Sequence, residues 1–244
     1  MSYSNGPKIV TDGLVLCLDA ANRKSYPLSG STIYDLSGNG NNGTFGASAA
    51  SPTFSGDNGG VLNFDGGDYF SGNLDYNLTT YPDFTVEAWV YGNSWTYANA
   101  YRGVLNRSNN VTHDFSVFIS SSLNTTNSTG QMASWIFNTS NNIVQHNSSS
   151  SLILQTGVWN HCVWSFNDNV GFTYYLNDSN GVTHNTSTTR RKTATTSPYN
   201  VGRWVGGGYF WDGKISTVKF YNRALSSDEI RRNYNALKGR YGLT

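Results

Sequence analysis

The stretch GKISTVKFYNRALSSDEIRRNYNALKGRYG (Gly213–Gly242) contains the clearest structural signals in the chain. Its first part is rich in β-branched and aromatic residues, which favour a strand. A helix should follow, because Ser226 and Glu229 have the spacing of a capping box. Gly239 lies where a left-handed C-cap would end that helix. The stretch therefore predicts a strand followed by one short terminal helix.

Strand-type segments separated by turn residues recur upstream of this stretch. Thr85–Tyr91 alternates, with Val86, Ala88 and Val90 on one face and Thr85, Glu87, Trp89 and Tyr91 on the other. In Lys214–Tyr221, alternation places Ile215, Thr217 and Lys219 opposite Ser216, Val218 and Phe220. The other expected strands are Leu14–Leu18, Val61–Phe64, Gly103–Leu105, Phe115–Ile119, Met132–Phe137, Leu152–Leu154, Val158–Phe166, Phe172–Leu176, Val201–Val205 and Tyr209–Trp211.

The length of 244 residues suits one large domain, and no segment is long enough to be a linker between two. We expect a single domain over residues 12–244. Residues 1–11 should form an N-terminal arm, either a frayed terminus or an arm that docks on a neighbour. They lack the apolar core of a signal peptide, and no run of about 20 apolar residues predicts membrane insertion.

The chain is poor in charge, with 13% charged residues against roughly 25% in typical soluble domains, and its net charge is +1. This balance argues against nucleic acid as a partner. The one basic triplet, Arg190–Lys192, is interpreted as a solvated loop or as a contact with an acidic neighbour. Cys17 and Cys162 lie in apolar strand patterns, so buried free thiols are expected, with a disulfide as the alternative.

Four stretches in order resemble LamG-like domains of the concanavalin A-like lectin/glucanase superfamily over roughly residues 12 to 242. They are GLVLCLDAANRKSYPLSGSTIYDLSGNGNNGTF (Gly13–Phe45), LNFDGGDYF with FTVEAWVY (Leu62–Phe70, Phe84–Tyr91), GVWNHCVWSFNDNVGFTYYLND (Gly157–Asp178) and FYNRALSSDEI (Phe220–Ile230). The resemblance implies an all-β, two-sheet antiparallel jelly-roll sandwich with one short C-terminal helix. The segments LDAANRKSYP, DLSGNGNNGT and YNALKGRYG are most similar to segments of structural proteins of tailed phages.

Catalytic residues are not expected. Glycoside hydrolysis usually needs two carboxylates facing each other, and the chain has only two glutamates, Glu87 and Glu229, of which Glu229 belongs to the capping box. The four histidines lie near no nucleophile motif, and His161 is read as structural. His113 and Asp114 are adjacent on a strand and should point to opposite faces. The sequence therefore predicts a protein that is not an enzyme.

Many domains of the resembled family hold Ca²⁺ at one rim through side-chain and backbone oxygens, the ligands that this ion prefers. The resemblance makes Asp35 and Asn39 of the DLSGNGN loop, and Asp65 and Asp68 of FDGGDY, the candidate ligands. Relatives often carry an acid where this chain has Ser216, which weakens the case. Solvated turn residues are the alternative.

Sugar binding uses aromatic faces against pyranose rings, together with polar groups that contact hydroxyls. Two loops, Gly92–Arg102 and Arg203–Gly213, are rich in aromatic residues. Packing in the core or at a sheet edge is the alternative for the tryptophans of the second loop. A subunit interface is the alternative for Trp95 and Tyr97 in the first. The candidate carbohydrate-binding residues are Trp95, Tyr97, Tyr101, Trp204, Tyr209 and Trp211.

Three functional interpretations follow. The first is a virion structural or surface protein of a tailed phage (fibre, tail or capsid decoration), made in the host cytoplasm and assembled with other virion proteins and copies of itself. Such a protein would either be passive decoration or bind host surface polysaccharide weakly and multivalently. The second is a carbohydrate-binding module or adhesin at a bacterial cell surface. The third, a glycoside hydrolase or lyase, is disfavoured by the lack of paired acids.

Overall fold

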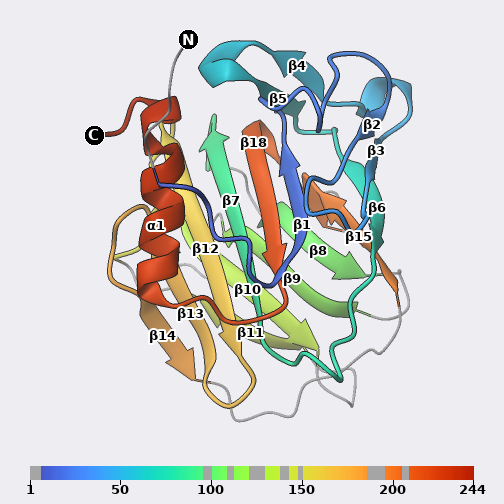
Figure 1. Cartoon of the computed structure of the whole chain (residues 1–244). Helices are drawn as coiled ribbons and strands as arrows, with labels where there is room; N and C mark the ends of the chain where they lie inside the picture. Colours follow the sequence, from blue (N-terminus) through green and yellow to red (C-terminus); the bar gives the residue numbers. More distant parts are fainter. Residues whose placement is uncertain are drawn as a thin grey trace.

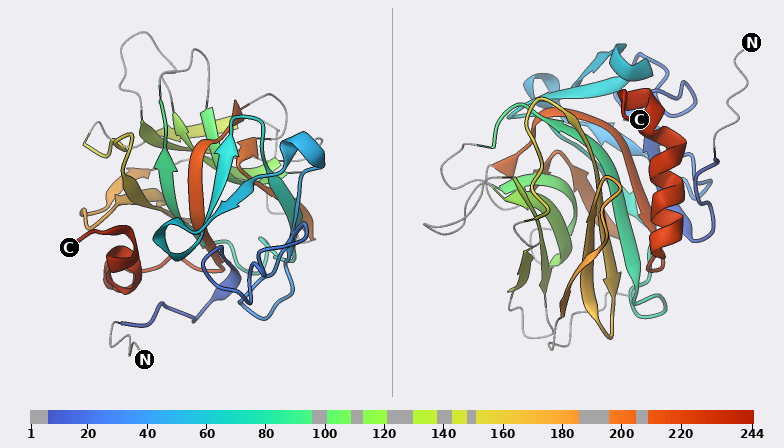
Figure 2. Two further views of the ribbon diagram at one scale, coloured as in Figure 1. Left: turned by 90° about the horizontal axis from the view of Figure 1, so that it is seen from above. Right: turned by 90° about the vertical axis from the view of Figure 1, so that its left-hand side faces the viewer.

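A computed structural model describes residues 7–95, 101–108, 113–120, 130–137, 143–147, 151–185, 196–204 and 209–244. In these residues the chain forms two antiparallel sheets of eight strands each, a two-stranded hairpin and one α-helix. The two sheets face each other, and the helix lies outside one of them (Figures 1 and 2). The expected two-sheet antiparallel sandwich with one C-terminal helix is confirmed.

The first sheet contains the longest strands. Its order is β14 (Val182–Asn185), β13 (Gly171–Leu176), β12 (Trp159–Asn167), β7 (Phe84–Gly92), β18 (Asp212–Tyr221), β5 (Val61–Asp65) and β4 (Thr53–Ser55), with β1 (Leu14–Asp19) also paired to β18. Strands from both ends of the chain therefore pair side by side at its centre.

The second sheet lies behind the first in Figure 1. Its order is β11 (Ile143–Asn147), β10 (Gln131–Phe137), β9 (His113–Ser120), β8 (Tyr101–Ser108), β15 (Ser197–Val201), β6 (Phe70–Leu74), β3 (Gly43–Phe45) and β2 (Thr32–Ile33). A separate hairpin, β16 (Arg203–Trp204) with β17 (Tyr209–Phe210), lies against β8. The short 3₁₀ turns are Ser48–Ala50, Asp57–Gly59 and Lys238–Tyr241.

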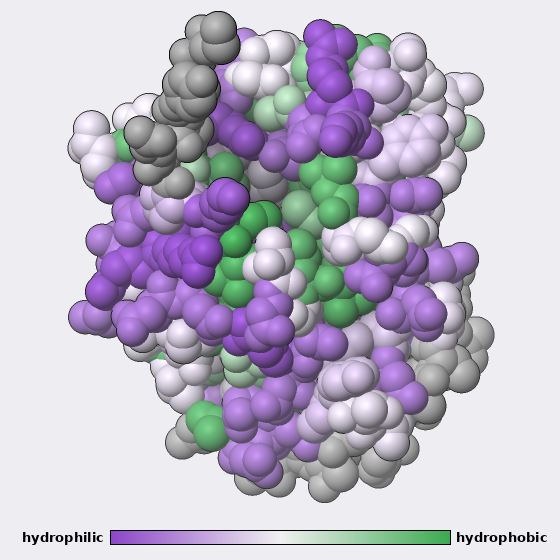
Figure 3. All heavy atoms as spheres, in the orientation of Figure 1, coloured by the Kyte–Doolittle hydropathy of each residue, from purple (hydrophilic) through white to green (hydrophobic). Residues whose placement is uncertain are grey.

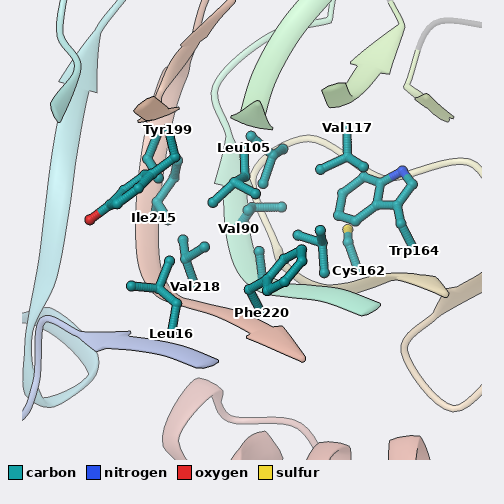
Figure 4. Packing of buried hydrophobic residues seen from close by; sticks show 14 of the residues in the cluster. Leu16, Val90, Leu105, Val117, Cys162, Trp164, Tyr199, Ile215, Val218 and Phe220 are labelled. Atoms are coloured by element: carbon teal, nitrogen blue, oxygen red, sulfur yellow. The ribbon is translucent and has the colours of Figure 1, made fainter. Parts of the chain in front are cut away.

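The main core fills the space between the two sheets (Figure 4). Val86, Ala88 and Val90 of β7 point into it, as alternation predicted. The opposite face of β7 is also buried, because the terminal helix covers it.

The alternation expected for β18 is wrong at Ile215. A β-bulge shifts the register between Ile215 and Thr217. The extra residue turns Ile215 onto the same face as Val218 and Phe220, and all three join the main core. A strand with a bulge cannot keep a strict period of two, which is why the sequence pattern alone misplaced this residue.

The helix α1 (Ser227–Leu237) begins as predicted. Ser226 accepts a hydrogen bond from the Glu229 backbone, and the Glu229 carboxylate accepts one from the Ser226 backbone, which confirms the capping box. The expected end at Gly239 is wrong, because the chain continues through the 3₁₀ turn Lys238–Tyr241. The left-handed residue is Gly242, with φ 72°. This extension packs Tyr241 against Trp89, with ring centroids 4.2 Å apart.

The last residues of the N-terminal arm contact the sandwich of their own chain. The Val10 backbone N–H donates to Asn233 Oδ1 at 2.7 Å, and its carbonyl accepts from the Tyr221 hydroxyl at 3.1 Å. Val10 is buried next to α1. Figure 3 shows this face of the molecule, where polar side chains surround a hydrophobic patch beside the helix.

Both cysteines are free and buried, so the expectation of unpaired thiols is confirmed. Burial raises the pKa of Cys17 to about 11, and burial also raises the pKa of Cys162 well above its ordinary value. In the described part of the chain, no helix is both long and apolar enough to cross a membrane. The basic triplet Arg190–Lys192 lies outside the described residues.

Candidate functional site: an aromatic surface on the second sheet

The outward faces of the two sheets differ. On the first sheet, α1 covers β7, and Glu87 is fully buried beneath the helix, 2.6 Å from Lys219 Nζ and 3.1 Å from His161 Nε2. Burial alone would raise the pKa of Glu87, but the Lys219 ammonium and the His161 ring outweigh it and bring the pKa to about 2. Glu87 therefore lies in a closed structural position rather than in an open cleft.

The outward face of β8, β9 and β10 contains a continuous group of aromatic rings, here called the aromatic cluster. Tyr101 is its centre, with ring centroids 4.3 Å from Phe118, 4.5 Å from Trp135 and 5.4 Å from Tyr209. Trp204 lies 4.9 Å from Trp135, in an edge-to-face arrangement. The members of the cluster are His113, Tyr101, Phe118, Trp135, Phe137, Trp204 and Tyr209.

Strand periodicity explains why these rings meet. In β10, Ala133, Trp135 and Phe137 share the outward face, while Met132 and Ile136 point to the core. Adjacent strands bring rings at matching positions into contact. The cluster is thus a product of three neighbouring strands.

The β16–β17 hairpin completes the cluster because it lies directly on β8. Arg102 Nη1 donates to the Phe210 carbonyl at 2.8 Å, and Asn106 Nδ2 donates to the Arg203 carbonyl. Gly103 permits this approach, because a Cβ there would lie 2.5 Å from the Arg203 carbonyl carbon and 2.8 Å from the Trp204 nitrogen. Trp204 and Tyr209 are thereby held over the sheet.

The cluster presents both buried and accessible rings. Tyr101, Phe118 and Trp135 are buried, whereas Trp204 and Tyr209 are partly exposed. The Nε1 atoms of Trp135 and Trp204 have no hydrogen-bond partner among the described residues. Both Nε1 atoms are buried, so the accessible part of the cluster is formed by the ring faces of Trp204 and Tyr209, which suit a ligand with C–H faces.

Next to the cluster, the Arg203 guanidinium lies over the ring of Tyr69, 3.4 Å from its centroid, and its Nε donates to Asn200 Oδ1 at 3.0 Å. The Arg203 side chain is thus held by Tyr69 and Asn200. Within the cluster, His113 stacks on Phe137, with ring centroids 4.6 Å apart.

The structure brings together three of the six carbohydrate-binding candidates, namely Tyr101, Trp204 and Tyr209. Trp95 and Trp211 lie instead in the main core, with centroids 5.6 Å apart, and Trp95 Nε1 donates to the Leu154 carbonyl at 3.0 Å. Tyr97 lies outside the described residues. Four members of the cluster, His113, Phe118, Trp135 and Phe137, were not among the predicted candidates. The period of two in the expected strand Met132–Phe137 is the signal that would have placed Trp135 and Phe137 on one face.

The two pairs of candidate calcium ligands lie apart. Asp35 accepts a hydrogen bond from the backbone N–H of Cys17, and Cys17 pairs with Lys219 of β18. Asp65 pairs with Asp212, which lies at the other end of β18. Seven residues of strand separate these positions by roughly 23 Å. In the described residues no three His, Cys, Asp or Glu side chains gather around a common point, so a calcium ion would also need backbone, amide or water oxygens.

The Asp35–Asn39 pair does not fit a cation. Both Asp35 oxygens accept hydrogen bonds, from the Cys17, Ser37 and Asn41 backbones and from the Ser37 hydroxyl, and the Asn39 amide donates to the carbonyls of Leu14 and Val15. Asp65 and Asp68 instead line a cavity of about 460 Å³, and each accepts one backbone N–H. Burial raises the pKa of Asp68.

Comparison with known proteins places this architecture in context. Residues 64–231 match the Laminin_G_3 family of the concanavalin A-like lectin/glucanases superfamily. No curated protein sequence matches the chain. Among solved structures, domain 4 of AbnA, a GH43 extracellular arabinanase from Geobacillus stearothermophilus in complex with arabinotriose, is similar with a TM-score of 0.63 and 16% identity, over 91% of this chain and 98% of that chain.

The binding domain of Paraclostridial Mosquitocidal Protein 1 is similar with a TM-score of 0.67 and 13% identity, over 96% of this chain and 56% of that one. The receptor binding domain of botulinum neurotoxin type G is similar with a TM-score of 0.64 and 14% identity, over 91% of this chain and 51% of that chain. This chain thus spans about half of each toxin domain. At these identities the likeness concerns the fold. Because the family match covers more than half of its residues, the chain belongs to the Laminin_G_3 family of the concanavalin A-like lectin/glucanase superfamily.

Proposed function

We propose that this protein is a non-enzymatic glycan-binding domain and that the aromatic cluster is its sugar-binding surface. The observation that carries the proposal is the pair of partly exposed rings, Trp204 and Tyr209, fixed over the sheet by the bonds that hold the β16–β17 hairpin on β8. Ring faces of this kind stack on the C–H faces of sugars. The similarity to a domain solved with arabinotriose supports the same class of ligand.

The absence of enzymatic activity is part of the proposal. Of the two glutamates, Glu87 is enclosed beneath α1, and Glu229 is bound by Arg223 and by the helix N-terminus. Neither carboxylate faces the aromatic cluster. A pair of acids across a sugar, as glycoside hydrolysis needs, is therefore not formed by these two residues.

We propose further that the domain works on the surface of a tailed-phage virion, among copies of itself and other virion proteins. Two observations support this role. The sequences of its loops resemble those of phage structural proteins, and the chain is poor in charged residues and rich in polar ones. Display in many copies would make individually weak contacts with host polysaccharide effective, because linked sites bind at high effective concentration. A carbohydrate-binding module of a bacterial cell surface would use the same face.

Calcium is proposed only at Asp65 and Asp68, where the carboxylates line an open cavity and the chemistry of the donors suits a hard cation. When bound, the ion would tie the Asp65–Asp68 turn to the neighbouring rim.

A panel of bacterial surface polysaccharides, tested with Ca²⁺ and again with EDTA, examines these proposals. We expect binding that Trp204→Ala weakens by about fivefold or more, because one stacked ring contributes about 1 to 3 kcal/mol. The matched control is Tyr34→Ala, an exposed tyrosine outside the cluster, which should bind as the parent does. Loss of binding in EDTA supports the calcium site. Equal binding by the Trp204→Ala variant would contradict the assignment of the surface.

A further inference from the structure

Three side chains with complementary reactivity meet in the closed space between β7, β18 and α1. Lys219 Nζ lies 2.6 Å from Glu87 Oε1, and Asn233 Nδ2 lies 2.6 Å from Glu87 Oε2. All three residues are at least 98% buried. One carboxylate therefore bridges an amine and a carboxamide out of contact with water.

The surroundings of the Asn233 amide favour attack on its carbonyl carbon. Asn233 Oδ1 accepts the Val10 backbone N–H at 2.7 Å, which would stabilise negative charge as it develops on that oxygen. Nδ2, the atom that would leave, donates both to Glu87 and to the Tyr221 hydroxyl at 3.0 Å. The nucleophile, the acid–base group and the oxyanion donor are thus all present.

We propose that Lys219 and Asn233 form an intramolecular isopeptide bond, with Glu87 transferring the protons. The bond would join β18 covalently to α1. Nothing in the glycan-binding proposal requires it, and it rests on a separate set of residues.

The reaction balances without a further reagent. Glu87 takes one proton from the Lys219 ammonium, and the neutral Nζ attacks Cγ of Asn233 to give a tetrahedral intermediate. Glu87 then delivers that proton to Nδ2, the Cγ–Nδ2 bond breaks and ammonia leaves. The second proton lost from Nζ passes to the departing ammonia, so the net products are a secondary amide and an ammonium ion.

Burial explains why these groups would react here although lysine and asparagine are inert to each other in water. Glu87, enclosed with them, contacts both reacting nitrogens, so it can pass a proton from Lys219 Nζ to Asn233 Nδ2 without a water molecule between them. Fixed positions also remove the entropy cost of bringing amine and amide together. Trp89 of β7 stacks on Tyr234 of α1, and this pair of rings helps to exclude water from the space.

Mass spectrometry of the purified full-length chain tests the proposal. The intact protein should weigh about 17 Da less than its sequence requires, the mass of ammonia. Trypsin should fail to cleave after Lys219, and the peptide ISTVKFYNR (Ile215–Arg223) should appear joined to NYNALK (Asn233–Lys238). Fragmentation should place the link between Lys219 and Asn233.

Variants identify the groups that react. The Lys219→Met and Asn233→Ala variants should each have the full mass that their sequence requires. The Glu87→Gln variant keeps the lysine amine and the asparagine amide, but the fraction of its molecules that carry the cross-link should be at least tenfold smaller than in the parent. The parent digest is independent of how the variants fold. Separate peptides ISTVK and FYNR after prolonged incubation at neutral pH would overturn the proposal. A loss of 17 Da that maps to an Asn–Gly succinimide would overturn it equally.

Discussion

Gly103 is the position at which the aromatic surface can be tested with one added carbon atom. In the Gly103→Ala variant, the new Cβ would lie 2.5 Å from the Arg203 carbonyl carbon, 2.7 Å from its oxygen and 2.8 Å from the Trp204 nitrogen. These are backbone atoms, which cannot rotate away as a side chain can. The β16–β17 hairpin must therefore move off β8, taking Trp204 and Tyr209 with it.

The size of the effect follows from the contacts that hold the hairpin. Its displacement removes the charge-assisted bond from Arg102 to the Phe210 carbonyl and the bond from Asn106 to the Arg203 carbonyl. Together these contribute about 2 to 4 kcal/mol to the free energy of unfolding. For a chain of this size that loss lowers the midpoint of thermal unfolding by roughly 5 to 15 °C.

Thermal unfolding and glycan binding should be measured on the Gly103→Ala variant beside Gly239→Ala. Gly239 has open space around its Cβ position and no positive φ, so its alanine variant should behave as the parent. We expect Gly103→Ala to unfold earlier and to lose glycan binding. A Gly103→Ala protein with parental stability and binding would refute the account of how the hairpin is seated.

Three further predictions follow from named contacts. The pKa of Glu229 is lowered to about 2, mainly by Arg223. The stability that this carboxylate contributes is therefore fully present above its unfolded pKa near 4.5 and is lost as the pH falls toward 2. Across this range the midpoint of thermal unfolding should depend less on pH in Glu229→Gln than in the parent. Cys17 and Cys162 should not react with a thiol reagent until the protein unfolds, and rapid native labelling would contradict their burial. Trp95→Ala should cost about 3 to 5 kcal/mol by denaturant unfolding, because its ring fills the core; a change below 1 kcal/mol would place it at the surface.

Local signals in the sequence were enough to predict the framework of the fold. The capping box at Ser226 and the alternation of Thr85–Tyr91 depend on neighbouring residues only, and the structure confirms both. The short strands β3 and β6 were not predicted, because GTF and FSGNL lack a run of β-branched residues. These strands exist because their neighbours in the sheet complete their hydrogen bonds.

The aromatic surface was only partly predictable, for reasons of tertiary structure. A tryptophan in a glycine-rich loop has the same local pattern whether it faces solvent, like part of Trp204, or the core, like Trp211. The grouping of Phe118 with Trp135 depends on the register between β9 and β10, which no local pattern gives. The bulge at Ile215 likewise arises from pairing between β18 and β7.

The most direct test of the central claim is a titration followed by ¹⁵N–¹H NMR. A fragment of a polysaccharide that binds the protein is added stepwise, and the indole N–H signals are recorded at each step. The signals of Trp204 and Trp135 should shift in proportion to saturation, because both indoles belong to the aromatic cluster that the ligand would contact. The signal of Trp164, whose Nε1 donates to the Ala133 carbonyl in the core, should stay in place. Binding that leaves Trp204 and Trp135 unshifted would contradict the claim that this surface receives the glycan.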